Sequence, residues 1–167
     1  MSTLRIEPAA RARGRRVADA IYGTILVLAV VAALSKDEQA TAGAILGGAL
    51  ATSVVFWIVH VYAEVLDREV EGATAGGWSM IRTAAWQEFP LVQAALLPMA
   101  PLVLGTIGVL GRSAAVNLSL AIGFFDLAAW GYVAGRTMHQ SRLRAGMQAA
   151  GAAGLGVLMV ALKNLVH

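Results

Sequence analysis

Four ionisable side chains lie inside or at the edge of apolar stretches, where charged groups are costly. Asp19 begins a run that carries no further charge as far as Leu34. His60 and Glu64 are four residues apart, so they share one face of a helix, and Asp126 lies near the centre of a later apolar stretch. Ionisable residues in membrane helices are rare and usually paired. We therefore predict a network that titrates or handles ions.

Three kinds of chemistry fit such a network. A histidine beside carboxylates can exchange protons near neutral pH. The same residues could instead form a polar staple between helices, without any reaction. A metal site built from His60 and Glu64 is a third reading, but two or three ligands of mixed type are a weak signal for a metal.

The composition places these residues in a membrane protein. The chain has 167 residues, 58% of them hydrophobic, and a mean hydropathy of +0.69, which is far outside the soluble range. It contains no cysteine, which excludes disulfides and thiolate metal sites. The many Ala and Gly residues suggest a bacterial plasma membrane.

The apolar stretches predict one all-α membrane domain of five spans, with a cytoplasmic N-terminus. A basic arm, residues 1–16, comes first, and residues 67–89 are too polar to span, so we expect an amphipathic segment at the interface. Pro90 should open the third span, because proline favours the first turn of a helix. The predicted spans are residues 17–34, 40–66, 90–111, 113–135 and 145–166.

The orientation follows from the basic residues, which concentrate on the cytoplasmic side of membrane proteins. With the N-terminus inside, only Lys36, Arg112 and Lys163 lie outside. Ten basic residues then lie inside: Arg5, Arg11, Arg13, Arg15, Arg16, Arg68, Arg82, Arg136, Arg142 and Arg144. In this orientation Asp19, His60 and Glu64 share one depth, and we expect them to cluster.

Other features of the spans concern packing. Pro98 and Pro101 should kink the third span and free backbone carbonyls near mid-membrane. Small residues recur every fourth position in two stripes, which permit close approach of another helix and predict self-association. The stripes are Gly43, Gly47 and Ala51, and Gly146, Ala150 and Gly154.

Two short motifs resemble a known family. Arg13 and Asp19 stand at the spacing of the Arg-x-x-x-Phe-Ser-Asp signature that opens the first helix of the transmembrane protein 175 family, the lysosomal and bacterial potassium channels. Trp57 and His60 are similar to the Trp-x-x-His of that family's second helix. Together the motifs cover about a quarter of the chain. Val17 and Ala18 replace the Phe and Ser of the signature, and the five spans predicted here are one fewer than in that family.

The resemblance implies roles for particular residues. In that family the matching side chains tie helices together on the cytoplasmic side, while another face of the first helix lines the ion path. The implied polar network is Arg13, Asp19, Trp57 and His60, to which Glu64 and Asp126 are added from their placement. The helix face opposite Asp19 presents the predicted pore-lining residues Thr24, Val27 and Val31.

These observations predict an oligomeric membrane protein that passes a monovalent cation, K⁺ or H⁺. The alternative is a non-conducting scaffold or accessory subunit that binds partner helices or lipid. An enzyme built on His60 is the least favoured reading, because no nucleophile, phosphate loop or cofactor motif accompanies it. We expect no cofactor, no metal and no nucleic acid partner.

Overall fold

In the computed structural model, the described residues form helices and no strands. Those residues are 8–72, 77–137 and 141–165, with the backbone alone described at 8–13, 15–16, 137, 155 and 158–165. The helices are α1 Pro8–Leu34, α2 Ala42–Val70, α3 Trp78–Gln87, α4 Phe89–Thr106, α5 Arg112–Thr137 and α6 Arg142–Leu165. The predicted all-α membrane bundle is confirmed.

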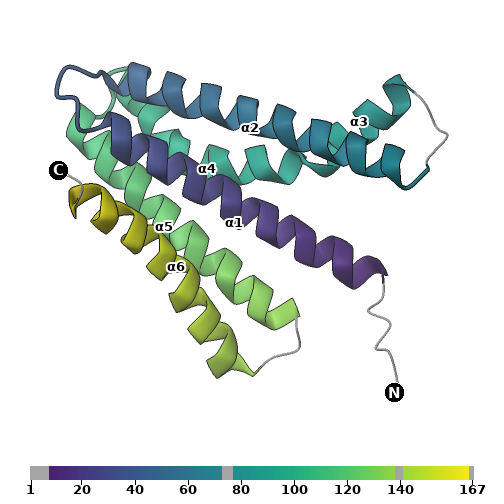
Figure 1. Cartoon of the computed structure of the whole chain (residues 1–167). Coiled ribbons are helices and arrows are strands. Elements are labelled where there is room, and N and C mark those ends of the chain that lie inside the picture. Colours follow the sequence, from purple (N-terminus) through teal and green to yellow (C-terminus); the bar gives the residue numbers. More distant parts are fainter. Residues whose placement is uncertain (1–7, 73–76, 138–140, 166–167) are drawn as a thin grey trace.

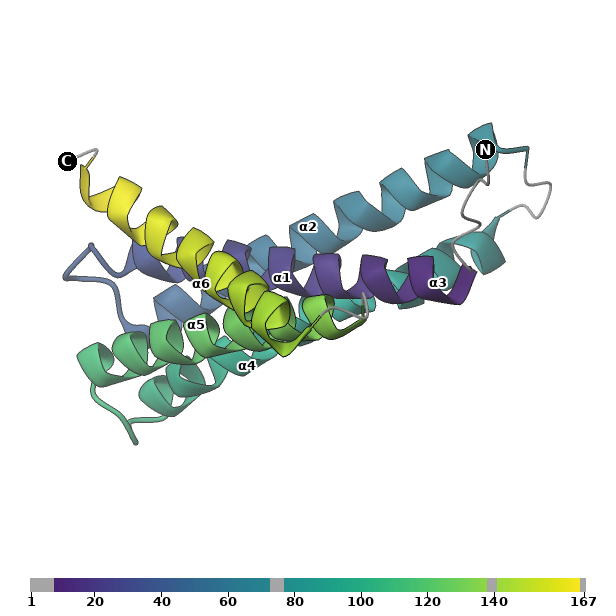
Figure 2. The same cartoon turned by 90° about the horizontal axis from the view of Figure 1, so that it is seen from below.

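The helices are arranged around α1, which packs against α2, α4, α5 and α6 (Figures 1 and 2). The α1–α2 and α4–α5 loops lie together at one end of the bundle. The helix α3 lies at the other end, beside the C-terminal end of α2 (Figure 1). The short helix α3 packs against α2 and α4. Short connections therefore join antiparallel neighbours, as expected for a helical bundle.

Four of the described helices are long and apolar enough to cross a membrane, namely α1 from Val17, α2, α4 and α5. They coincide with the first four predicted spans. The fifth predicted span, residues 145–166, falls on α6, much of whose second half lies outside the residues with described side chains. A membrane crossing by α6 stays a prediction.

Three helices begin or end at other residues than the predicted spans, although the first candidate span itself runs from Val17 to Leu34 as predicted. The helix α1 begins at Pro8, inside the predicted arm, because proline suits a first turn and the following Ala and Arg residues favour helix. The helix α2 continues to Val70, past its predicted end at Leu66. The helix α4 ends at Thr106 and not at Gly111, because Gly108 adopts a φ of 81° that stops the helix.

The core lies between α1, α2, α4 and α5. Val27, Val31 and Ile45 are almost fully buried there, against Met99 and Leu102 of α4. Burial of such side chains is the main favourable term in folding, at about 1.5 to 3 kcal/mol each. The packing is one contiguous cluster that joins α2, α4 and α5 to α1.

Both interior prolines of α4 are buried, and α4 remains one helix through them. The buried hydroxyl of Ser119 on α5 donates to the Pro98 carbonyl oxygen at 2.6 Å. Side chains of a neighbouring helix commonly satisfy carbonyls around a proline in this way. The predicted kink and freed carbonyls stay a prediction, and the sequence did not indicate the bond from Ser119.

Arg112 connects the two loops at one end of the bundle. Its guanidinium donates to the carbonyl oxygens of Ala40 at 2.6 Å, Asp37 at 2.6 Å and Ser35 at 2.9 Å. The five N–H groups of arginine suit several carbonyls at once. The first residue of α5 therefore holds the α1–α2 loop in place.

The small-residue stripes have little contact within the chain. A Cβ at Gly47, Gly146 or Gly154 would meet nothing within 4 Å, and Ala51 and Ala150 are exposed. Close helix contact within the chain instead occurs at other glycines. A Cβ at Gly131 would lie 2.8 Å from the Gln148 carbonyl oxygen and 2.9 Å from the Ala149 Cα on α6.

We expect Gly131→Ala to destabilise the protein, because the added methyl meets backbone atoms that cannot rotate away. Overpacking of this kind costs about 1 to 3 kcal/mol. Gly14→Ala is the matched control, because a Cβ there would meet nothing within 4 Å, and it should be neutral or up to about 1 kcal/mol stabilising, since alanine favours helix. Unfolding in mixed detergent micelles measures both free energies. Equal effects of the two changes would contradict the described α5–α6 contact.

Candidate functional site

The candidate site is a polar pair between α1 and α5, deep in the apolar part of the bundle. The Thr24 hydroxyl donates to the Asp126 carboxylate at 2.7 Å, and it also lies 3.0 Å from the Ala20 carbonyl oxygen. Thr24 is fully buried and Asp126 is half-buried. Trp130, one turn further along α5, also hydrogen-bonds to Asp126.

This pair differs from the predicted arrangement. The sequence placed Asp126 in one polar network with His60, and the structure gives it Thr24 as its partner. The reason is that α5 packs extensively against α1 and only slightly against α2. Thr24 was predicted to line a pore and not to bond a carboxylate, so its role here was missed.

The predicted pore face of α1 is closed within one chain. Thr24 and Val31 have no exposed surface and Val27 has 1%. The two valines belong to the core cluster, against residues of α4 and α5. These side chains therefore line no open path through a single subunit.

His60 lies on aromatic rings and not on the other predicted network members. Its ring centroid is 5.7 Å from that of Tyr22 on α1 and 6.4 Å from that of Phe56. Its Nδ1 is 2.9 Å from the Phe56 carbonyl oxygen of its own helix. The helices α1 and α2 meet beside His60, and the contact there is between tilted rings, those of His60 and Tyr22.

Glu64 is the centre of a separate polar group at the end of α2. It is 8% exposed and forms an ion pair with Arg68 at 3.0 Å. Arg68 also donates to Gln87 of α3. The residues i and i+4 of a helix are neighbours, which brings the pair together, and Gln87 extends it to the next helix.

Trp57 connects α2 to α3, because its indole N–H donates to the Ala85 carbonyl oxygen at 3.1 Å. Its predicted role as a residue that ties helices together is consistent with this bond. Asp19 is half-buried on α1 and takes part in a polar interaction of its own. The side chain of Arg13 lies outside the described residues.

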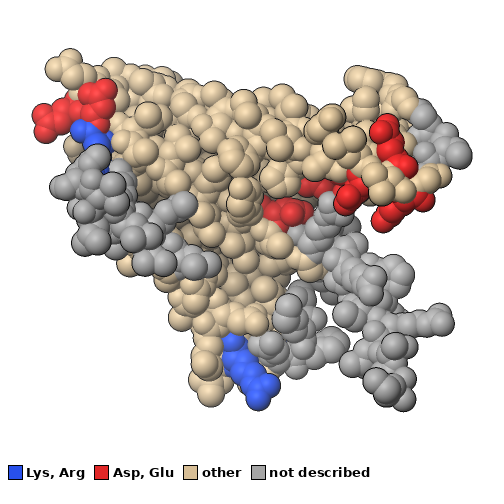
Figure 3. Space-filling view, in the orientation of Figure 1, with Lys and Arg blue, Asp and Glu red and all other residues tan. Residues whose placement is uncertain are grey.

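Among the described contacts, Asp126 bonds to Thr24, His60 lies on Tyr22, and Glu64 pairs with Arg68. Asp19 and Glu64 each take part in a further interaction, so the predicted cluster of Asp19, His60 and Glu64 stays a prediction. In Figure 3, charged side chains lie at both ends of the bundle, a further acidic patch lies nearer its middle, and basic atoms lie at the lower edge, while the upper stretch along α2 shows neither sign. Within the described part of the chain, no three His, Asp or Glu residues gather as metal ligands.

Comparison with known protein families, curated proteins and solved structures finds no match for this chain. The resemblance to the transmembrane protein 175 family stays a prediction carried by the two short motifs. What the site does must therefore be inferred from its own geometry.

We expect Thr24 and Asp126 to be energetically coupled. Thr24→Val and Asp126→Ala should each cost about 1 to 3 kcal/mol, because each removes the hydrogen bond between the hydroxyl and the carboxylate. The double variant should cost less than the sum by about 0.5 to 2 kcal/mol. A double-mutant cycle of unfolding in detergent measures this difference.

Ser53→Ala provides the control for that cycle, because Ser53 is equally buried but donates to Ala49 of its own helix at 2.9 Å. Combined with Asp126→Ala, it should give additive losses. Additivity in the Thr24 cycle as well would show that the α1–α5 hydrogen bond contributes nothing.

Proposed function

We propose that the protein is a homo-oligomer that passes a monovalent cation, K⁺ or H⁺, across a bacterial plasma membrane, as the resemblance to the transmembrane protein 175 channels implies. The observation that carries the proposal is the bond between Thr24 and the intramembrane carboxylate of Asp126. A carboxylate in a membrane span is costly enough that a functional role is the first hypothesis.

The geometry of this pair suits both protonation states of the carboxylate. A hydroxyl has one hydrogen to donate and two lone pairs that accept. When Asp126 is ionised, Thr24 donates to it at 2.7 Å. When Asp126 is protonated, its O–H can donate to Thr24, whose own hydrogen turns to the Ala20 carbonyl oxygen 3.0 Å away. Gain and loss of a proton therefore leave no unpaired polar group, which favours H⁺ over K⁺.

The depth of Asp126 along α5 suits a residue that an ion contacts on its way across the membrane. Asp126 is near the middle of α5, a helix of 26 residues, so about 20 Å of helix separates it from the first residue, Arg112. An ion must reach that depth through water or a chain of polar groups. Because the core beside Thr24 is closed within one chain, we infer that the path runs between copies of the chain.

Two surfaces support association of copies. One face of α2 exposes Val55, Ile58 and Val59 along with Gly47 and Ala51. On α6, the stripe at Gly146, Ala150 and Gly154 faces away from the other helices. Small residues on an open helix face allow a second helix to approach closely.

The proposal is tested by flux into liposomes that contain the purified protein, under a K⁺ or an H⁺ gradient. Asp126→Asn should lower the flux by roughly tenfold or more, because the amide cannot carry the exchangeable proton or the charge. Asp37→Asn, in the exposed α1–α2 loop, should leave the flux unchanged. Full flux in Asp126→Asn, or no flux of either ion in the unmodified protein, would contradict the proposal.

Self-association is tested separately by native mass measurement in a mild detergent. The unmodified protein should be an oligomer, and Gly47→Leu or Gly154→Leu should shift it toward monomer by blocking close helix approach. Gly72→Leu is not a suitable control, because Gly72 has a φ of 82°, a backbone conformation that a leucine adopts only with strain. Val70→Leu, an exposed position at the end of α2, is the matched change. If the unmodified protein were a monomer, self-association would be contradicted.

The second candidate function is a non-conducting scaffold or accessory subunit that binds partner helices. The observation that favours it is the complete burial of Thr24, Val27 and Val31, the face from which a pore was predicted. The same flux measurement separates the two functions. An oligomer that is fully folded but impermeable to both ions would leave the scaffold as the better account.

A further inference from the structure

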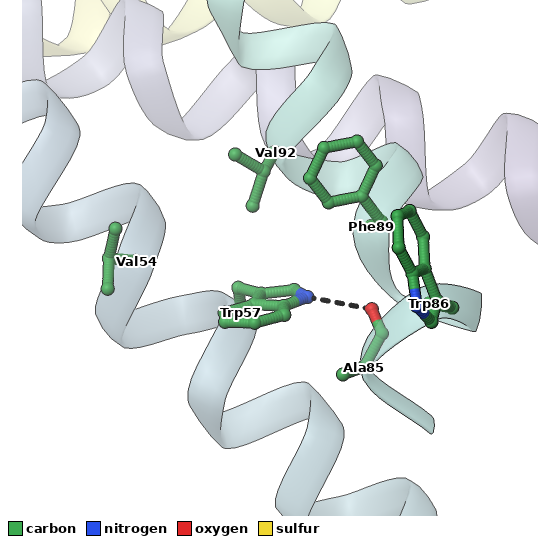
Figure 4. Close-up of a pocket in the computed structure, with 6 residues that line it drawn as sticks. All are labelled: Val54, Trp57, Ala85, Trp86, Phe89 and Val92. Carbon is green, nitrogen blue, oxygen red and sulfur yellow. Dashed lines mark hydrogen bonds between the residues drawn. The ribbon is translucent and has the colours of Figure 1, made fainter. Parts of the chain in front are cut away.

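An apolar groove opens on the side of the bundle where α2, α3 and α4 meet (Figure 4). Its volume is about 350 Å³, within the range of roughly 300 to 1,000 Å³ typical of ligand sites. In Figure 4, Trp57 faces Trp86 and Phe89 across the opening. The lining residues are Val54 and Trp57 of α2, Ala85 and Trp86 of α3, and Phe89 and Val92 of α4.

The side chains that line the groove are apolar except for the indole N–H groups of Trp57 and Trp86. The Trp57 N–H is already used by the Ala85 carbonyl oxygen at 3.1 Å, and the Trp86 ring is 69% exposed. The rings of Trp86 and Phe89 hold each other with centroids 5.7 Å apart. An occupant with hydroxyls or charges inside the groove would lose hydration without gaining partners. An alkyl chain makes no hydrogen bonds with water, so it loses none when it enters the groove.

The groove is continuous with the surface that faces lipid. Val54 lies 12 residues into α2, so it is about 18 Å from the start of that span and past the middle of a bilayer core of about 30 Å. One turn beyond Val92 on α4, Leu96 is exposed. Toward the other end, Trp86 is 69% exposed on α3, as suits a tryptophan at headgroup level.

A basic side chain lies on the same helix as two of the residues that line the groove. Arg82 is one turn before Trp86 on α3, so the two share a helix face, and it is exposed. Within the part of the chain that the structure describes, Arg82 forms no ion pair. A phosphate diester at that level would give the guanidinium a charged partner.

From these observations we infer that the groove between α2, α3 and α4 binds one acyl chain of a membrane phospholipid, with the phosphate beside Arg82. This site is separate from the Thr24–Asp126 pair, and it does not depend on whether the protein conducts. The occupant is a lipid and not a second copy of the chain, because the opening runs from headgroup level into one leaflet, between elements of the same chain.

Native mass spectrometry of the detergent-purified protein, titrated with dioleoylphosphatidylglycerol, tests the inference. The unmodified protein should retain one phospholipid per chain after other lipids are removed. Val54→Phe and Val92→Phe fill the groove and should lower retention by about tenfold or more, as loss of most of a buried chain implies. Val55→Phe adds the same bulk on the exposed neighbouring face and should leave retention unchanged.

Arg82→Gln tests the contribution of the phosphate separately from that of the acyl chain. It should weaken phospholipid binding by about two- to fivefold, the range of an exposed charge pair, and leave binding of dioleoylglycerol, which lacks a phosphate, unchanged. Circular dichroism confirms that each variant is folded. Equal retention in Val92→Phe and Val55→Phe, or no retained lipid in the unmodified protein, would overturn the inference. Loss of a bound second copy in Val92→Phe, in place of a lipid, would show that the groove is a subunit interface.

Discussion

The buried face of α1 is the constraint around which the other helices are arranged. Val27 and Val31 leave no room for solvent, and they require α2, α4 and α5 to close on them from three sides. A helix in such a central position has to bury whatever polar groups it carries. Thr24 falls on this face, and its hydroxyl finds the carboxylate of Asp126. The candidate site is therefore a product of the same packing that holds the bundle together.

Polar contacts between helices then fix how the helices slide and rotate relative to one another. In an apolar environment, an unpaired hydroxyl or carboxylate costs more than it does in water, so few arrangements satisfy every group. Ser119 bonds the Pro98 carbonyl on α4, and Arg112 bonds the α1–α2 loop. Close packing of Gly131 against α6 adds a steric limit of the same kind. These contacts act at different depths, so together they define one register.

The sequence predicted where the helices lie better than it predicted which side chains contact one another. Hydropathy located four helices that can span a membrane, and Pro90 marked the first turn of α4. These signals are local. The partner of Asp126 is 102 residues earlier in the chain, and depth along a helix cannot say which neighbour a side chain faces. His60 was placed at the right level, but its stack on Tyr22 depends on the rotation of α1, which no periodicity in a hydrophobic stretch reveals.

The bond from Arg112 to the α1–α2 loop has a consequence for how the protein is made. Chains leave the ribosome N-terminus first, so the carbonyls of Ser35, Asp37 and Ala40 exist more than seventy residues before Arg112 is synthesised. During that interval the α1–α2 hairpin has to rest in the bilayer with those oxygens hydrated. Arrival of α5 replaces that water with a guanidinium. The bonds that fix the α1–α2 loop can therefore form only after the chain has been made as far as the start of α5.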